Sequence, residues 1–228
     1  QGLVETERDR TVGVTVTQSQ SQTVTITDTS IAASDLSTLN SNTTGLVTAT
    51  SVATLTGTAA AITTLIGNEG DSGDKVALDT DFAMTVSSGT ATVDQANTMA
   101  AFSTSGAITA TISNTDIAEL DDLTTASTDQ LTITVASTSA TAAQLTTVAG
   151  ATGLNVTATA VETVTGTATQ MDALLAVEGS TGDKVNLDAD YNITIDSGTA
   201  TVTQVNTYSA TTGVVTATIS DTDIATLD

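Results

Sequence analysis

The chain contains nearly the same sequence twice. Residues 23–121 return as residues 132–228, in places letter for letter, at an offset of 109 positions. GDKVALD at 73–79 becomes GDKVNLD at 182–188, and a two-residue deletion further on lowers the offset to 107. A repeat this regular indicates an array of similar units. Arrays provide length and surface more often than catalytic chemistry.

A shorter period of 23–32 residues is visible inside each copy. Short helical patterns such as AAAITTLIG at 59–67 follow a Ser or Thr that can cap a helix. Between them stand segments of alternating Val, Thr and Ile, such as LVTATSVATLT at 46–56, which are typical of β-strands. Helices are expected to begin near Ser30, Thr58, Thr90, Thr115, Ser139, Thr167, Thr199 and Thr222.

A unit this small cannot bury its own apolar side, so neighbouring units must stack along an axis. We therefore expect a mainly β protein, a β-solenoid with a short helical turn in most coils. The alternative is two tandem β-sandwich domains, because the long repeat also has the length of an immunoglobulin-type domain. The expected organisation is an N-terminal extended arm or cap at 1–22, repeat copy 1 at 23–131 and a truncated copy 2 at 132–228, forming one continuous solenoid within a longer protein.

The composition favours a thin core and excludes several partners. Thr makes up about a quarter of the chain, hydrophobic residues 39% and aromatic residues 2%. Such small side chains fit a narrow core that is continuous along an axis. A net charge of −22 with four basic residues excludes nucleic acids and anionic membrane surfaces as partners. No run of 18 apolar residues is present, so no membrane insertion is expected.

Catalysis is not expected. The chain has no His and no Cys, so the usual triads, thiol nucleophiles and zinc sites lack their central residues. A pair of carboxylates can hydrolyse glycosides. The clefts that hold a sugar usually also contain Trp, Tyr or Arg, however, and this chain has two Tyr, no Trp and no Arg beyond Arg10. We therefore predict a protein that is not an enzyme.

One acidic motif, GDKV-x-LD-x-D, occurs in both copies. In an extended segment, carboxylates two residues apart share one face, and with Gly-rich carbonyls beside them they suit Ca²⁺, the only cofactor that the sequence suggests. The alternative is that these are solvated turn residues, with Lys75 and Lys184 each pairing with a nearby Asp. The candidate ligands are Asp74, Asp79, Asp81, Asp183, Asp188, Asp190 and Asn192.

Thr-x-Thr pairs form a second pattern, with Thr54/Thr56 and Thr163/Thr165 as examples. Stacked on neighbouring strands, such pairs would form flat ranks of hydroxyl and methyl groups. Such ranks resemble the ice-binding faces of β-helical antifreeze proteins. The alternative is that Thr is simply a good polar strand former on an outward face.

Three longer phrases carry a broader resemblance: TATISNTDIAELDDLT at 109–124, VTATAVETVTGTATQMDALL at 156–175 and TGDKVNLD at 181–188. They resemble the Thr/Ala/Val-rich acidic repeats of very large cell-surface and secreted proteins of marine bacteria, cyanobacteria among them. The resemblance implies an extracellular repeat region in a stalk, surface layer, filament or adhesin.

We therefore expect a structural or adhesive segment of an extracellular surface, surface-layer or filament protein. Its expected partners are neighbouring repeats of the same protein, copies of itself, or surface glycans. One alternative is a phage or virus fibre shaft, whose trimer would be recognised by its mass in solution. The other is a protein that binds ice or carbohydrate.

Overall fold

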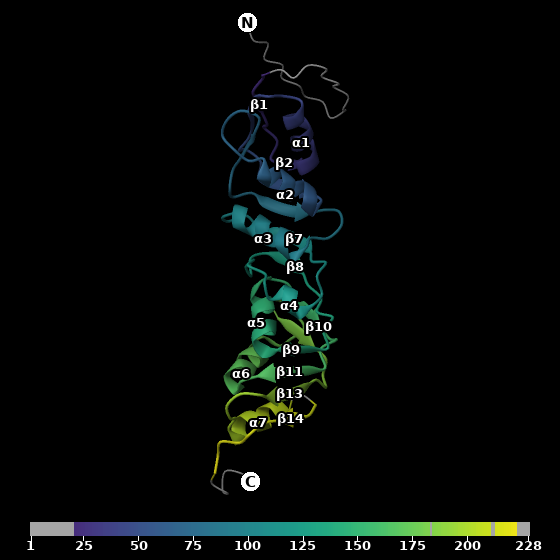
Figure 1. Cartoon of the computed structure of the whole chain (residues 1–228), viewed down its shortest axis with the longest axis vertical. Helices are drawn as coiled ribbons and strands as arrows, with labels where there is room; N and C mark the ends of the chain where they lie inside the picture. Colours follow the sequence, from purple (N-terminus) through teal and green to yellow (C-terminus); the bar gives the residue numbers. More distant parts are fainter. Residues whose placement is uncertain (1–20, 183, 211–212, 223–228) are drawn as a thin grey trace.

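The computed structural model describes residues 21–182, 184–210 and 213–222. Helices and strands follow one another along a single long axis, with β1 at one end and α7 and β14 at the other (Figure 1). The helices are α1 (Ala33–Ser41), α2 (Ala59–Gly67), α3 (Val93–Phe102), α4 (Ile117–Leu120), α5 (Ala142–Gly150), α6 (Ala168–Val177) and α7 (Val202–Ser209). The strands are β1 (Val24–Thr25), β2 (Ser30–Ala32), β3 (Val47–Ala49), β4 (Thr54–Gly57), β5 (Val76–Leu78), β6 (Ala83–Val86), β7 (Ile108–Thr111), β8 (Gln130–Thr132), β9 (Ser139–Thr141), β10 (Val156–Ala158), β11 (Thr163–Gly166), β12 (Val185–Leu187), β13 (Asn192–Ile195) and β14 (Val215–Thr216).

The fold is α/β. The expectation of a mainly β protein, a β-solenoid with a short helical turn in most coils, is wrong. In the described part of the chain seven helices alternate with short parallel strands, and the helices contain more residues than the strands. The tandem β-sandwich alternative is wrong as well, because every strand pair in the described ranges is parallel whereas sandwiches are antiparallel.

The error has a physical source in the strand segments. Alternating stretches such as 46–56 contain two strands of three and four residues separated by a turn, rather than one long strand. The helical stretches, by contrast, extend to eight to ten residues in six of the seven described helices. Thr and Val alternation therefore overestimates the strand content of this chain.

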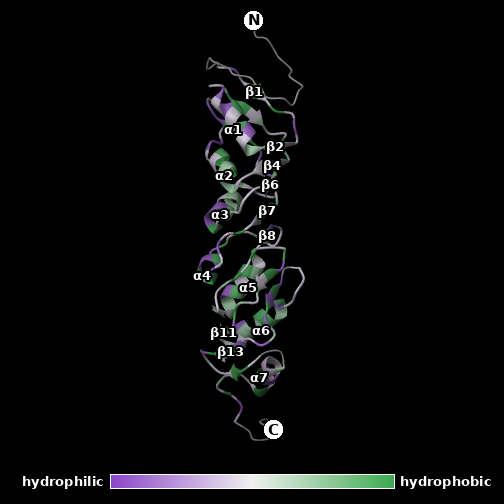
Figure 2. Cartoon of the chain, turned by 90° about the vertical axis from the view of Figure 1, so that its right-hand side faces the viewer, coloured by the Kyte–Doolittle hydropathy of each residue, from purple (hydrophilic) through white to green (hydrophobic). Residues whose placement is uncertain are grey.

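The strands form four sheets whose members are distant in sequence. The two larger sheets, in which successive strands lie one after another along the long axis, are β2-β4-β6-β7-β8 and β9-β11-β13-β14. The two smaller sheets are β1-β3-β5 and β10-β12. Most paired positions lie 24 or 29 residues apart, as in Thr54 with Ser30 and Thr54 with Ala83. In Figure 2, α1 to α4 follow one side of the molecule and β2, β4, β6, β7 and β8 the other.

Threonines begin most of the helices. Thr58 and Thr167 cap α2 and α6 as predicted, each accepting a backbone N–H three residues on. The remaining described helices start two or three residues later than expected, and at α1 and α5 the strands β2 and β9 run directly into the helix. At α3, α5, α6 and α7 a Gln at the third helical position completes a capping box. The start expected near Thr222 concerns residues beyond those described.

We call the residues between two paired strand positions one layer. The layer in the middle of the molecule is shorter than the others in the described part of the chain. Thr109 on β7 pairs with Gln130 on β8 only 21 residues later, and α4 between them is a single turn. The boundary between the two sequence copies, after residue 131, falls inside β8. Just beyond β8, Thr134 forms a bridge with Thr157 on β10, so the same segment links the sheets of both copies.

The core is one cluster of buried side chains that runs from Ala33 to Tyr208, in which Leu, Ile and Met stand beside Ala and Val. The prediction that the core is continuous along the molecule is confirmed, whereas the expectation that it consists mainly of small side chains is not. Phe82, Tyr191 and Tyr208 are its aromatic members among the described residues. No helix in the described ranges is both long and apolar enough to cross a membrane.

Candidate functional site

The acidic motif lies at the corners between consecutive strands that belong to different sheets. Asp79 and Asp81 occupy the turn from β5 to β6, and Asp188 and Asp190 the equivalent turn from β12 to β13. These four side chains and that of Asp74 are exposed, and Asp183 lies outside the described residues. The backbone bends at 80–81 and again at 189–190, so the extended geometry assumed for adjacent carboxylates is not present there.

The carboxylates of these corners bond to their own turns. Asp79 Oδ1 accepts from the Thr80 N–H, and Asp188 Oδ1 accepts from the Ala189 N–H, both at 2.7 Å. In the described part of the chain, no group of three or more acidic side chains is arranged to hold a metal ion. The calcium site therefore stays a prediction, which a measurement in the Discussion tests.

Asn192, the last of the candidate ligands, connects strands. Its Nδ2 donates to the Glu162 carbonyl at 3.3 Å, and its Oδ1 accepts from the Val214 N–H at 2.9 Å. Asn192 begins β13, so its amide joins the segments on either side of that strand. This arrangement indicates a stacking role for the amide.

Lys184 has a structural partner. Its ammonium donates to the Ala176 carbonyl at 2.7 Å, in the last turn of α6. Helix C-termini carry unpaired carbonyls and partial negative charge, so a lysine there is favourable. The lysine of the second motif therefore stabilises the end of the preceding helix.

The expected threonine ranks are present in part. Neighbouring strands are about 4.8 Å apart in a sheet, so threonines in register form a row along the axis. Most members of the rows are partly buried, and the last one of each row is exposed. The rows are Thr56, Thr85 and Thr109 in the first half, and Thr141, Thr165, Thr194 and Thr216 in the second.

Both tyrosines make hydrogen bonds to carboxylates, which the sequence analysis did not anticipate. Tyr191 is buried, and its hydroxyl donates to Glu178 Oε2 at 3.1 Å. Burial raises the pKa of Glu178, although the tyrosine hydrogen bond opposes that rise. Burial and the nearby carboxylate both raise the pKa of Tyr191. The first copy has Phe82 at this position, without a hydroxyl.

The second pair connects two helices. The hydroxyl of Tyr208 on α7 lies 2.7 Å from Asp172 Oδ1 and 2.9 Å from the Ala168 carbonyl, both on α6. Gln204 Nε2 donates to the other carboxylate oxygen of Asp172 at 2.8 Å. Burial, and then the Asp172 hydrogen bond and charge, raise the pKa of Tyr208. The first copy has Met99 and Thr63 at the equivalent positions, so both partners differ together.

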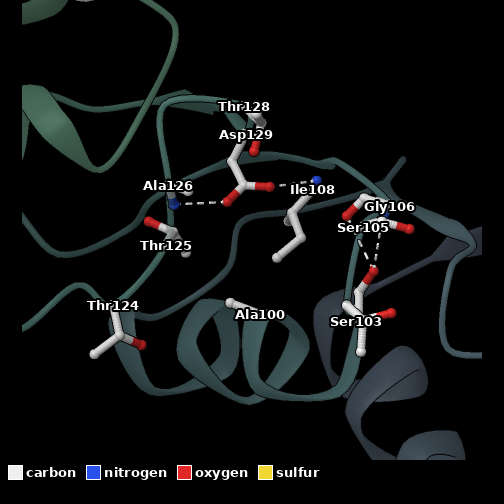
Figure 3. A pocket seen from close by; sticks show the side chains of 11 residues that line it. Ala100, Ser103, Ser105, Gly106, Ile108, Thr124, Thr125, Ala126, Thr128 and Asp129 are labelled. Atoms are coloured by element: carbon white, nitrogen blue, oxygen red, sulfur yellow. Dashed lines mark hydrogen bonds between the residues drawn. The ribbon is translucent and has the colours of Figure 1, made fainter.

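A shallow groove opens beside the short middle layer (Figure 3). It has a volume of about 140 Å³ and lies between the C-terminal part of α3 and the loop that follows α4. Asp129 is buried beside it, and its two oxygens accept from the N–H groups of Ile108 and Ala126 at 2.8 and 2.9 Å. Ser103 at the end of α3 accepts from the Gly106 N–H and donates to a nearby carbonyl. These polar groups are used to hold backbone turns, which indicates a structural groove.

Comparison with known proteins adds no relative: no family model, no curated protein and no solved structure matches this chain. The function is therefore argued from the geometry. Most of the side-chain hydrogen bonds among the described residues go to the backbone of the same or a neighbouring layer. What the arrangement offers is a long, acidic, internally connected body.

Proposed function

We propose that this chain is a structural segment of an extracellular repeat protein, which acts as a spacer or filament element and not as an enzyme. The observation that supports this best is the stacking of parallel strands along one axis, with a single core beneath them (Figure 1). Each layer contacts its neighbours, so the length of such a body grows with the number of layers.

Buried hydroxyl groups connect successive layers and support a mechanical role. Thr43 donates to the Gln22 carbonyl and accepts from the Gly45 N–H. Thr152 makes the equivalent contacts one copy later, with Leu131 and Leu154. A side chain that satisfies backbone groups of two layers resists their separation, because breaking the contact leaves buried polar groups unpaired.

The surface and the sequence resemblance support the extracellular setting. A net charge of −22 keeps a long β-containing body soluble. The repeats resemble those of large bacterial surface and secreted proteins, in which neighbouring repeats adjoin. The partners proposed here are accordingly adjacent repeats and further copies of the chain.

Single-molecule pulling from the two ends tests the spacer function. A layered body should unfold in steps of one layer, and 21 to 29 residues released at about 3.4 Å each give extensions of roughly 70–100 Å. The double variant Thr109→Cys with Gln130→Cys should remove the step between β7 and β8 when oxidised and restore it when reduced. Release of the whole chain in one step at low force would contradict the proposal.

A second candidate function rests on the threonine row on β9, β11, β13 and β14. A row of hydroxyl and methyl groups with a spacing of about 4.8 Å offers a regular surface to ice or to a polysaccharide. Thermal hysteresis and a glycan array test this. Thr165→Lys should abolish either signal, whereas Thr147→Lys on the exposed side of α5 should not, and wild-type protein without any signal excludes the candidate.

A further inference from the structure

We propose that copies of this chain associate head to tail, with β14 and the residues after it in one copy pairing with residues 21–23 of the next. This inference rests on the proposed structural function and names the partner and the contact. The partner is a second copy of the chain. The contact is a continuation of the sheet across the boundary between two molecules.

The template is the contact between the two sequence copies inside the chain. There β7 pairs with β8, and the Ile112 N–H extends the pairing by donating to the Thr132 carbonyl at 3.0 Å. The repeat makes residues 215–219 equivalent to 108–112, and residues 21–26 equivalent to 130–135. The paired positions inside the chain are Thr109 with Gln130, Ala110 with Leu131, and Thr111 with Thr132.

The same register can be written for two molecules. Among the described residues, β14 pairs with β13 alone and so has one further strand edge, and Ser21, Gln22 and Thr23 belong to no strand. An edge of this kind is a template for pairing with another chain. The corresponding positions between two copies are Thr216 with Ser21, Ala217 with Gln22, and Thr218 with Thr23.

The inward apolar side chains on β14 and just after it are less buried than their equivalents in the middle of the molecule. Ile108, Ala110 and Ile112 are at most 5% exposed in the middle of the molecule, where β8 covers them. Their equivalents Val215, Ala217 and Ile219 are only partly buried. The same inward positions therefore lose cover where no described strand follows.

The N-terminal end shows the complementary loss. The inward side chains just after β8 and on β9 are buried, whereas their equivalents in the first layer are only partly buried. The buried members are Ile133, Val135 and Ala140, and the equivalents are Val24, Ile26 and Ile31. At each end, therefore, apolar side chains are partly exposed although their equivalents are buried at the internal junction, the contact between the two sequence copies around β7 and β8.

One position departs from the template. Leu131 is fully buried at the internal junction, and its equivalent is Gln22, which is exposed. A glutamine at an inward position weakens the contact, because its amide loses water when the second copy covers it. The association between copies is therefore weaker than the internal junction, and residue 22 controls its strength.

The departure provides a test in both directions. Gln22→Leu restores the side chain found at the internal contact and should tighten association of the full chain by about tenfold. Sedimentation at about 0.5 M NaCl, which screens the net negative charge of the two copies, measures it. Thr23→Leu is the matched control, since its equivalent Thr132 faces solvent, and should have no such effect. Ala217→Asp should abolish association, whereas Thr218→Asp, its outward neighbour, should weaken it far less. Equal effects of Gln22→Leu and Thr23→Leu would overturn the proposal.

Cross-linking tests the register itself. The chain contains no cysteine, and facing positions on neighbouring strands are close enough for a disulfide. A mixture of Ser21→Cys and Thr216→Cys proteins should form the mixed dimer on oxidation, whereas Thr216→Cys mixed with Thr157→Cys should not. Absence of the mixed dimer would refute the contact and leave the spacer function to the pulling experiment, which depends only on layers within one molecule.

Discussion

Thr152 binds both backbone groups of Leu131. Its Oγ1 accepts from the Leu131 N–H at 2.9 Å and donates to the Leu131 carbonyl at 2.8 Å, and both residues are fully buried. The same oxygen accepts from the Leu154 N–H at 3.1 Å. One hydroxyl thus takes the place of strand hydrogen bonds where the chain passes from one layer to the next.

Replacing Thr152 with Val should therefore cost about 1–3 kcal/mol of unfolding free energy, because the shape is kept while buried N–H groups lose their acceptor. Chemical denaturation measures the change. Thr157→Val is the matched control, since Thr157 is an exposed threonine on β10 and its replacement should change stability by less than about 0.5 kcal/mol. Equal effects of the two substitutions would show that the hydrogen bonds of Thr152 to Leu131 and Leu154 do not contribute to stability.

The helices were more predictable than the strands. Thr58 and Thr167 lie directly before apolar residues at helical spacing, and Gln170 three residues after Thr167 completes a capping box, so the local sequence determines the start of the helix. The strands are two to four residues long, too short for alternation to define them. Their positions depend on pairing with residues 21 to 29 positions away.

The polar contacts between layers were not predictable from one sequence. Thr152 looks like every other threonine, and only burial distinguishes it from Thr157. Tyr208 and Asp172 are 36 positions apart, so nothing local connects them. The available signal was that both positions differ together between the copies, with Met99 and Thr63 in the first copy where the second has Tyr208 and Asp172. The acidic motif lies in turns, as the alternative interpretation of turn residues expects, and not in the extended backbone that the calcium interpretation assumed.

Asn40 gives a stabilising prediction. Its Oδ1 is buried without a hydrogen-bond partner in the described structure, and the equivalent residue in the second copy is Ala149, which is also buried. Asn40→Ala should raise the melting temperature by about 2–4 °C, because an unpaired buried acceptor costs about 1 kcal/mol or more. The reverse exchange, Ala149→Asn, should lower it. A thermal melt of both variants decides, and a lower melting temperature for Asn40→Ala would mean that its volume matters more than its polarity.

The tyrosines predict a loss of stability at high pH. Both have a raised pKa in the folded state, so they stay protonated where the unfolded chain, with a tyrosine pKa of about 10, loses its protons. Their contribution is complete below about pH 10 and is lost as the pH rises further. Glu178 does not affect this test, because a carboxyl group titrates at acidic pH. Its raised pKa stabilises the folded state at low pH, and this contribution is lost as the pH rises through that pKa. Denaturation curves between about pH 8 and 11, a range that brackets the ordinary tyrosine pKa, should show the free energy of unfolding falling above about pH 10. Tyr191→Phe introduces the residue that the first copy has at this position, Phe82, and should make the fall in unfolding free energy with pH less steep. An unchanged dependence on pH would show that Tyr191 ionises normally.

The calcium hypothesis predicts that Ca²⁺ stabilises the folded chain. A ligand that binds only the folded state must raise the melting temperature, and extracellular calcium modules respond to about 0.1–1 mM. Melts in EDTA and in a few millimolar Ca²⁺, about the upper end of that range, should therefore differ. Asp188→Asn should remove the difference, whereas Asp35→Asn, an exposed aspartate on α1, should retain it. Identical melts in EDTA and Ca²⁺ would identify Asp79, Asp188 and their neighbours as solvated turn residues whose carboxylates serve their own backbone N–H groups.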